Sequence, residues 1–287
     1  MKNEILSVLP GDHPWAEHLH IHEQLSSTNI ELKGLAQAGA PQGTTVIARE
    51  QTAGRGRMGR SFYSQKDTGL YISCLLRPNC APTDLMHLTC ATGVAVTRAT
   101  QKACGATPQI KWINDLVMGN KKLGGILTEL SISPQTGLVE YAIVGIGINC
   151  LQDEFPEDLS QIATSLLLST RATCSPARLA AFLIGELFDM AQTLLSDKNS
   201  WIESYRKSCI TLNKEVMVHI GDHHFAATAK DIDADGSLVV LYLTEQKKSY
   251  PPEKPLCGAI GDMYDICDEK TSLLINFHCI FSLLWIY

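Results

Sequence analysis

A run of glycine and arginine at residues 54–60 (GRGRMGR) restricts the fold of this chain more than any other feature. It follows the segment 44–50 (TTVIARE), which is typical of a β-branched strand. A run so rich in glycine is not regular structure, so we expect a loop where the strand ends. Its glycines leave backbone N–H groups accessible and its arginines add fixed positive forks, which together suit bound phosphate.

An exposed basic turn and an RNA-binding Arg-Gly segment are the alternatives for this loop. A general nucleic-acid binder usually carries a basic excess, whereas this chain has 24 Lys and Arg against 30 Asp and Glu, a formal net charge of −6. The run is no P-loop, because no Lys-Ser or Lys-Thr pair ends it, and no clear helix follows it as a dinucleotide fingerprint requires. We therefore expect a small phosphate-bearing ligand and no nucleic acid.

Hydrophobic periodicity predicts strands and helices on both sides of the loop. Strands are expected at 16–22, 44–50, 69–78 and 138–150, and helices at 28–39, 84–104 and 179–194. Thr28 and Glu31 have the spacing of a capping box that opens the first helix. The dipeptide Gly119 and Asn120 lies between the segments 115–118 and 121–130, which indicates a two-residue hairpin.

From Glu215 the pattern changes to short alternating strands with Gly-Asp and Asp-Gly turns, typical of a small β-barrel. We expect a catalytic domain at 1–212, this barrel at 213–268 and an apolar tail at 269–287. Residues 271–287 carry no Asp, Glu, Lys or Arg, but 17 residues are borderline for a membrane span and no basic cluster flanks them. We expect a packed or non-native tail and no membrane association.

The cellular location is expected to be the cytoplasm. The N-terminus has no continuous apolar run that would make a signal peptide. The 10 cysteines are dispersed and none shows C-x-x-C spacing, so reduced thiols are the simpler interpretation.

A second group of polar residues, 111–115 (KWIND) and the lysines after the turn, is brought side by side by the predicted hairpin. Lysines suit phosphate or carboxylate, Asn114 can donate and accept, and Asp115 could bind Mg²⁺ through oxygen. Adjacent Lys121 and Lys122 must point to opposite faces of a strand. We choose Lys122 for the site.

A third group lies in the apolar segment 144–149 (VGIGIN). Gly145 and Gly147 weaken a strand, so they often mark close approach by a ligand or another backbone, although sheet packing alone is the alternative. Asn149 would end the strand with a polar side chain that could hydrogen-bond a ligand. His18, His20 and His22 share one face of a strand but lack an acidic or cysteine partner with ligand spacing, so we assign them a structural role.

Taken in order, the segments 27–29, 51–60, 111–115, Lys122 and 145–149 resemble the biotin protein ligase family. The resemblance implies an α+β fold: a central mixed β-sheet with helices packed on one side, as in class II synthetase-like catalytic domains, followed by a small SH3-like β-barrel. It implies an enzyme that activates biotin with MgATP to biotinoyl-5′-AMP and pyrophosphate. The enzyme then transfers biotin to a lysine of the biotin carboxyl carrier protein of acetyl-CoA carboxylase. Homodimerisation is left open.

The resemblance also implies a role for each matching position. It assigns biotin binding to Ser27, Thr28, Asn29, Gln51, Arg55, Gly56, Arg57 and Lys122. It assigns ATP binding to Arg57, Arg60, Lys111, Asn114, Lys122 and Asn149, catalysis to Lys122, Lys111 and Arg57, and Mg²⁺ or the bound intermediate to Asp115.

The chain departs from the family pattern at three places. Ile113 stands where the family usually has proline, which we expect to loosen the strand only slightly. The DNA-binding N-terminal domain of bifunctional members is absent, so we do not expect repression of transcription. Residues 256–270 and the tail fit poorly to the usual last strands.

Two other functions are consistent with parts of the pattern. A lipoate or octanoate transferase of the same superfamily shares the sheet but generally lacks the Gly-Arg run. A non-catalytic nucleotide sensor or RNA-binding protein could use the same basic loop, but the presence of Lys122 with Lys111 and Arg57 favours an active enzyme.

Overall fold

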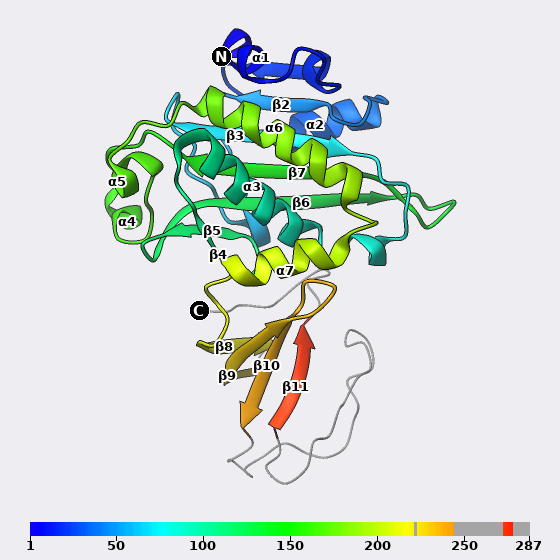
Figure 1. Cartoon of the computed structure of the whole chain (residues 1–287), viewed down its shortest axis with the longest axis vertical. Helices are drawn as coiled ribbons and strands as arrows, with labels where there is room; N and C mark the ends of the chain where they lie inside the picture. The colour runs from blue at the N-terminus through cyan, green and yellow to red at the C-terminus, as the bar shows by residue number, and fades with distance from the viewer. Residues whose placement is uncertain (221–222, 244–271, 278–287) are drawn as a thin grey trace.

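Two β-sheets organise the chain in the computed structural model, which describes residues 1–220, 223–243 and 272–277. The larger sheet lies in the N-terminal unit under several helices, and the smaller sheet lies beyond α7 (Lys198–Ser208) (Figure 1). The described helices include none that is long and apolar enough to span a membrane.

The larger sheet has seven strands in the order β1-β2-β3-β7-β6-β5-β4. The strands are β1 (Leu19–His22), β2 (Thr45–Ala48), β3 (Gly69–Leu76), β4 (Gln109–Lys111), β5 (Asp115–Met118), β6 (Lys121–Ile132) and β7 (Val139–Asn149). β1 pairs with β2 in parallel and all other neighbours are antiparallel, so the sheet is mixed, as expected. β7 lies between β3 and β6 and is almost entirely buried, which explains its continuous apolar sequence.

The other helices are α1 (Lys2–Val8), α2 (Thr28–Gln37), α3 (Leu88–Cys104), α4 (Glu157–Ser160), α5 (Leu166–Thr170) and α6 (Pro176–Thr193), with short 3₁₀ helices η1 (Ala16–His18), η2 (Arg57–Gly59) and η3 (Pro82–Leu85). α3 and α6 cross the near face of the sheet in Figure 1. The apolar stripe predicted for α6 is buried against this face at Leu179, Leu183, Leu187, Met190 and Leu194. The core of the N-terminal unit therefore lies between this helix pair and the sheet.

α2 packs on the opposite face of the sheet. Its Leu32 and Ala36 form a second buried cluster with Val46, Leu75 and Tyr141. The expectation of helices on one side only was wrong, because α2 also needs an apolar surface for its buried stripe. α2 contacts β2, β3 and β7, and the part of that face formed by β6 and the end of β7 is left for the site.

The hairpin between β5 and β6 is confirmed. Gly119 and Asn120 both have positive φ, 55° and 67°, as a two-residue hairpin turn of this kind requires. Two local predictions were wrong. The segment 16–22 begins with η1 and only its end is a strand, and Ile113 lies in the connection between β4 and β5 rather than in a strand.

The capping box predicted from Thr28 and Glu31 is also absent. Ser27 is the N-cap residue of α2, and its side chain makes no capping hydrogen bond. The Thr28 hydroxyl instead lies 3.2 Å from Gln51 Oε1. A tertiary partner has replaced the local one, because Thr28 faces the site.

The smaller sheet has the order β11-β10-β9-β8 and is antiparallel, which is consistent with an SH3-like module. Its strands are β8 (Glu215–Ile220), β9 (His223–Ile232), β10 (Leu238–Leu243) and β11 (Ser272–Phe277). The first three agree with the predicted strands. The backbone of β11 pairs with β10, so these residues of the predicted tail belong to the sheet. The predictions for 244–271 and 278–287 lie outside the described residues.

The turn between β9 and β10 docks on the N-terminal unit. The Trp112 indole donates a hydrogen bond of 3.0 Å to the Gly236 carbonyl, and the Arg206 Nε donates one of 2.8 Å to the Ile232 carbonyl. Gly236 has a φ of 86°, and a Cβ there would lie 2.8 Å from Cys90 Sγ. Both the left-handed backbone and the close packing require glycine at this contact.

We predict that Gly236→Ala lowers the free energy of unfolding by about 2–5 kcal/mol, the sum of a left-handed backbone penalty and an overpacking penalty. Gly137→Ala is the matched control, since Gly137 also has a positive φ of 70° but nothing within 4 Å of an added Cβ. It should cost only the backbone part, about 1–2 kcal/mol. Urea unfolding measures both, and equal losses would contradict the packing at Cys90.

Candidate active site

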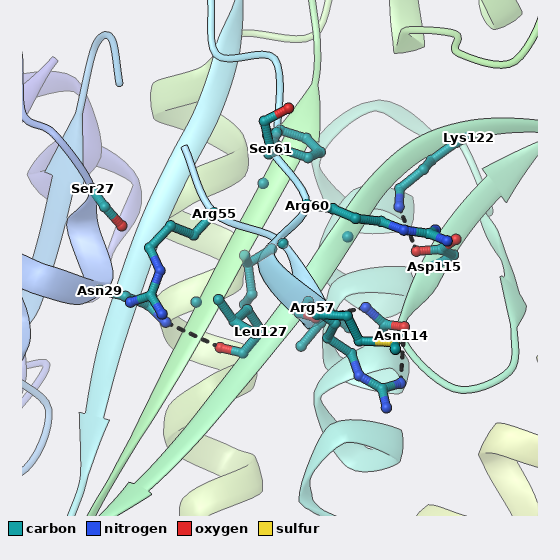
Figure 2. A pocket seen from close by; sticks show the side chains of 18 of the residues that line it. Ser27, Asn29, Arg55, Arg57, Arg60, Ser61, Asn114, Asp115, Lys122 and Leu127 are labelled. Carbon is teal, nitrogen blue, oxygen red and sulfur yellow. Dashed lines mark hydrogen bonds and ion pairs between the residues drawn. The ribbon is translucent and has the colours of Figure 1, made fainter. Parts of the chain in front are cut away.

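A cavity of about 200 Å³ opens where the 54–60 loop crosses the face of β6 and β7 (Figure 2). Every residue of the predicted site except Asn149 lines it. These residues are Ser27, Thr28, Asn29, Gln51, Arg55, Gly56, Arg57, Arg60, Lys111, Asn114, Asp115 and Lys122. They come from the start of α2 with its N-cap residue, the segment 51–60, the β4–β5 hairpin and β6, so four separate segments converge on one pocket.

Asn149 is placed differently. It is buried beside the cavity, its Nδ2 donates to the Thr164 carbonyl at 3.0 Å, and its Oδ1 accepts from Gln152 Nε2 at 3.2 Å. Asn149 therefore does not line the cavity, and its predicted nucleotide contact stays a prediction. The segment around Thr164 covers the end of β7, which the local sequence of β7 could not reveal.

One end of the cavity is cationic. Lys122 Nζ donates to Asp115 Oδ1 at 2.6 Å, and Arg57 Nη1 donates to Asn114 Oδ1 at 3.4 Å; Figure 2 shows both pairs. Lys111 lines the same cavity. Cations gathered from three segments around one carboxylate produce a field that favours an anionic ligand.

The backbone around Lys122 explains why this lysine, rather than its neighbour, faces the cavity. The register of β5 and β6 shifts here, and Lys122 exchanges backbone hydrogen bonds of 2.8 Å with Ile162 and Thr164. Lys121 points elsewhere, and its Nζ donates to the Ser160 carbonyl at 2.8 Å. The choice of Lys122 from strand alternation agrees with this arrangement.

The other end of the cavity is polar, and its connected hydrogen-bonding side chains are uncharged. Thr28 N donates to Gln51 Oε1 at 3.0 Å, and Gln51 Nε2 donates to Ser64 Oγ at 2.9 Å. The Ser73 hydroxyl lies 2.7 Å from Thr28 Oγ1 and 2.6 Å from Asn29 Oδ1. These side chains form one connected chain of donors and acceptors, and all but Gln51 are nearly inaccessible to solvent.

Glycines in β7 make room for the groups above the sheet. A Cβ on Gly145 would lie 2.0 Å from Asn29 Oδ1, and one on Gly147 would lie 2.6 Å from the Phe62 ring. The predicted close approach at these glycines is confirmed, but the groups that approach are side chains of the protein. Gly145 and Gly147 thus allow α2 and the loop to close over the strand.

The sequence motifs alone did not indicate Phe62 or Ser73 as residues of the site. Phe62 lines the cavity and packs edge-on against Tyr71, with ring centroids 6.4 Å apart. Ser73 connects the polar chain. A signal for Ser73 existed, because strand alternation places it on one face with Tyr71 and Leu75, where it is the polar member. Nothing local distinguished Phe62 from other aromatic residues.

Neither a thiol nor a bound metal is suggested by the described side chains. The cysteines in the described ranges are free, and burial raises the pKa of the Cys74 thiol to about 12, which makes it a poor nucleophile. Among those ranges, no group of three His, Cys, Asp or Glu residues could hold a metal ion. The lining of the pocket itself offers cations and hydrogen-bonding groups.

Comparison with solved structures gives the class to which this fold corresponds. The fold is similar to that of a biotin protein ligase from Aquifex aeolicus in complex with biotin and ATP, with a TM-score of 0.67 and 27% sequence identity over 80% of this chain and 93% of that one. A biotin protein ligase from Leishmania major in complex with biotinyl-5-AMP gives a TM-score of 0.56 at 27% identity, over 78% of this chain and 94% of that one.

Sequence comparison leads to the same class. The model of the biotin/lipoate A/B protein ligase family matches residues 21–149. The biotin–[acetyl-CoA-carboxylase] ligase of Mycobacterium tuberculosis is 30% identical over 226 residues, 77% of this chain and 82% of that protein. The bifunctional ligase/repressor BirA of Bacillus subtilis is 43% identical over 152 residues, 52% of this chain and 46%, about half, of that protein's length. The chain belongs to the biotin/lipoate A/B protein ligase family.

We predict that Gly145→Ala lowers the free energy of unfolding by about 1–3 kcal/mol, because the new methyl group displaces the Asn29 amide. Gly145 has no left-handed φ, so its backbone accepts alanine. In the background of Asn29→Ala the same substitution should cost less than about 1 kcal/mol, since the obstructing atoms are gone. Urea unfolding of the four proteins gives the comparison, and equal losses in both backgrounds would rule out this contact.

Proposed function

We propose that this protein is an ATP-dependent biotin protein ligase. It forms biotinoyl-5′-AMP from biotin and MgATP, and it transfers biotin to a lysine of the biotin carboxyl carrier protein of acetyl-CoA carboxylase. One observation carries the proposal: a single cavity has a buried neutral polar chain at one end and cations at the other. Biotin has the matching polarity, with a neutral ureido ring at one end and a carboxylate at the other.

The polar end favours biotin over lipoate or octanoate. A ureido ring offers two N–H donors and a carbonyl acceptor to the chain formed by Thr28, Asn29, Gln51 and Ser73. A dithiolane ring or an alkyl chain would make no hydrogen bond with this chain, and a site built for hydrogen bonding favours the ligand that can make them.

The cationic end supports the first step. A carboxylate oxygen of biotin bonds to the α-phosphorus of ATP while the bond from that phosphorus to the bridging oxygen breaks, and pyrophosphate leaves. Two anions must meet in this step. Arg57, Lys111 and Lys122 would screen their repulsion and stabilise the charge of the pentacoordinate transition state, so positioning matters more than acid–base chemistry.

The loop supports the second step. The amine nitrogen of the carrier lysine bonds to the acyl carbon while the bond from that carbon to the phosphate oxygen breaks. AMP leaves and the amine gives up its proton. Until the carrier docks, the mixed anhydride must be kept from water, and the 54–60 loop lies over the cavity where it can do so.

Mg²⁺ would enter with the nucleotide. Asp115 provides a carboxylate at the cavity, and Mg²⁺ is commonly held by one or two carboxylates together with substrate phosphates. The donor set fits an ion of this kind and offers no cage of protein ligands within the described ranges. When bound, the ion would neutralise phosphate charge in the first step.

The direct test is transfer. We expect the purified chain, supplied with ATP, Mg²⁺ and biotin, to add biotin to a biotin carboxyl carrier domain, detected as an increase in the mass of the carrier. A reaction without ATP is the control. Transfer of lipoate in place of biotin would move the assignment to the other branch of the family.

Lys122→Ala should lower the rate of biotinoyl-AMP formation by about 10²–10³-fold, because a cation that stabilises transition-state charge is lost. Lys121→Ala is the matched control, since the neighbouring ammonium group bonds the Ser160 carbonyl outside the cavity. Pyrophosphate release measures the rate, and circular dichroism checks that both variants fold. Adenylation by Lys122→Ala at the rate of Lys121→Ala would refute its role.

Arg57→Gly should release biotinoyl-AMP before transfer and label bystander proteins several-fold more than the unmodified chain. The reason is that Arg57 anchors the loop across the cavity through Asn114, and closed loops protect reactive intermediates. Lys66→Gly, an exposed site outside the cavity, is the control. A streptavidin blot of added albumin reports the labelling, and unchanged retention of the intermediate would count against a protective loop.

A further inference from the structure

Glu129 lies on β6, opposite Ile143 of β7, and lines a second cavity next to the site rather than the site cavity itself. Its Oε2 accepts a hydrogen bond of 2.7 Å from Asn29 Nδ2. Its Oε1 lies 3.3 Å from Arg55 Nη1. The carboxylate therefore joins α2, which carries Asn29, to the loop, which carries Arg55, yet no motif in the sequence pointed to it.

The chemistry of the carboxylate decides how the Asn29 amide is turned. An ionised carboxylate only accepts hydrogen bonds, so the NH₂ end of Asn29 must face Glu129. The second hydrogen of that NH₂ group is directed at the Leu127 carbonyl, 3.3 Å away. The amide oxygen is thereby directed at the Ser73 hydroxyl, 2.6 Å away.

The orientation of Asn29 affects the rest of the polar chain. With its oxygen toward Ser73, Asn29 acts as an acceptor at the buried end of the cavity. A reversed amide would present an N–H donor to Ser73 instead. The Ser73 hydroxyl could then donate its proton only to Thr28 Oγ1. The pattern of donors and acceptors that meets a ligand therefore depends on which way the Asn29 amide is turned.

We propose that Glu129 is a positioning residue for the polar end of the site: it sets the orientation of the Asn29 amide and so the hydrogen-bonding pattern that receives the ureido ring. This inference rests on the proposed function. Glu129 acts through Asn29 and touches no reacting atom. Its pairing with Arg55 adds a second tie to the start of the loop.

The partial exposure of the Glu129–Arg55 pair separates this role from a purely structural one. Both side chains are partly accessible, 31% and 47%, and pairs of this kind contribute little to folding. Removal of the carboxylate should therefore change ligand affinity much more than stability. It should also raise the KM for biotin while leaving kcat at saturating biotin close to that of the unmodified chain, because binding rather than chemistry is affected.

Calorimetric titration of the purified chain with biotin, without ATP, tests the proposal. We expect Glu129→Ala to weaken binding about tenfold or more and Glu129→Gln, which keeps an acceptor but loses the charge, to weaken it less. Glu140→Gln is the matched control. Glu140 is an exposed glutamate on the neighbouring strand β7 that accepts from Ser131 Oγ at 3.0 Å outside the cavity, and its loss should leave affinity unchanged.

A double-mutant cycle tests whether Glu129 acts through Asn29. In the background of Asn29→Ala, the further change Glu129→Ala should lose most of its effect on affinity, since the amide that it orients is gone. Equal effects in both backgrounds would overturn the proposal. Urea unfolding midpoints check each variant, and Glu129→Gln, which has the same shape as the native residue, carries the test if Glu129→Ala does not fold.

The failure of this proposal can be distinguished from the failure of the proposed function. An unmodified chain that does not bind biotin would refute the function and this inference together. Tight binding by the unmodified chain with equal binding by Glu129→Ala and Glu129→Gln would refute the positioning role alone.

Discussion

The contact between Asn29 and Gly145 is the constraint on which the site depends. Asn29 lies against the backbone of β7 because Gly145 has no side chain, and this closeness brings the start of α2 onto the open face of the sheet. From there Asn29 reaches Ser73 on β3 and Glu129 on β6. One missing methyl group thus allows a helix and two strands to share one hydrogen-bonded network.

Under the proposed function, the pocket separates two tasks along its length. At the polar end, the buried hydrogen-bonding side chains would recognise the ureido ring of biotin, which is how polar sites discriminate between similar ligands. At the cationic end, Arg57 and Lys122 would provide positive charge where the two anionic substrates meet. The fold fixes the position of the two ends relative to each other, because β6 and β7 run beneath the whole cavity. Backbone hydrogen bonds from Lys122 to Ile162 and Thr164 also hold the cationic end in place.

Much of the fold could be predicted from the sequence where the signal was local. The β5–β6 hairpin followed from Gly119 and Asn120, whose positive φ angles few other residues adopt, and the α6 stripe followed from helical spacing. The capping box failed because Thr28 bonds Gln51 on another segment, so a partner distant in sequence replaced the local one. The hydrogen bond between Asn149 and the Thr164 carbonyl also joins two separate segments, and the local sequence held no sign of it.

The sequence by itself determined the family resemblance, most of the strands and most of the residues that line the pocket, because glycines, charges and apolar periodicity leave local traces. Only the tertiary structure decided which other residues hold the pocket-lining side chains in position. Ser73 and Glu129 gain their importance from distances of 2.6 and 2.7 Å to Asn29, far away in the chain. Such contacts arise when sheet and helix pack together, and no short segment encodes them.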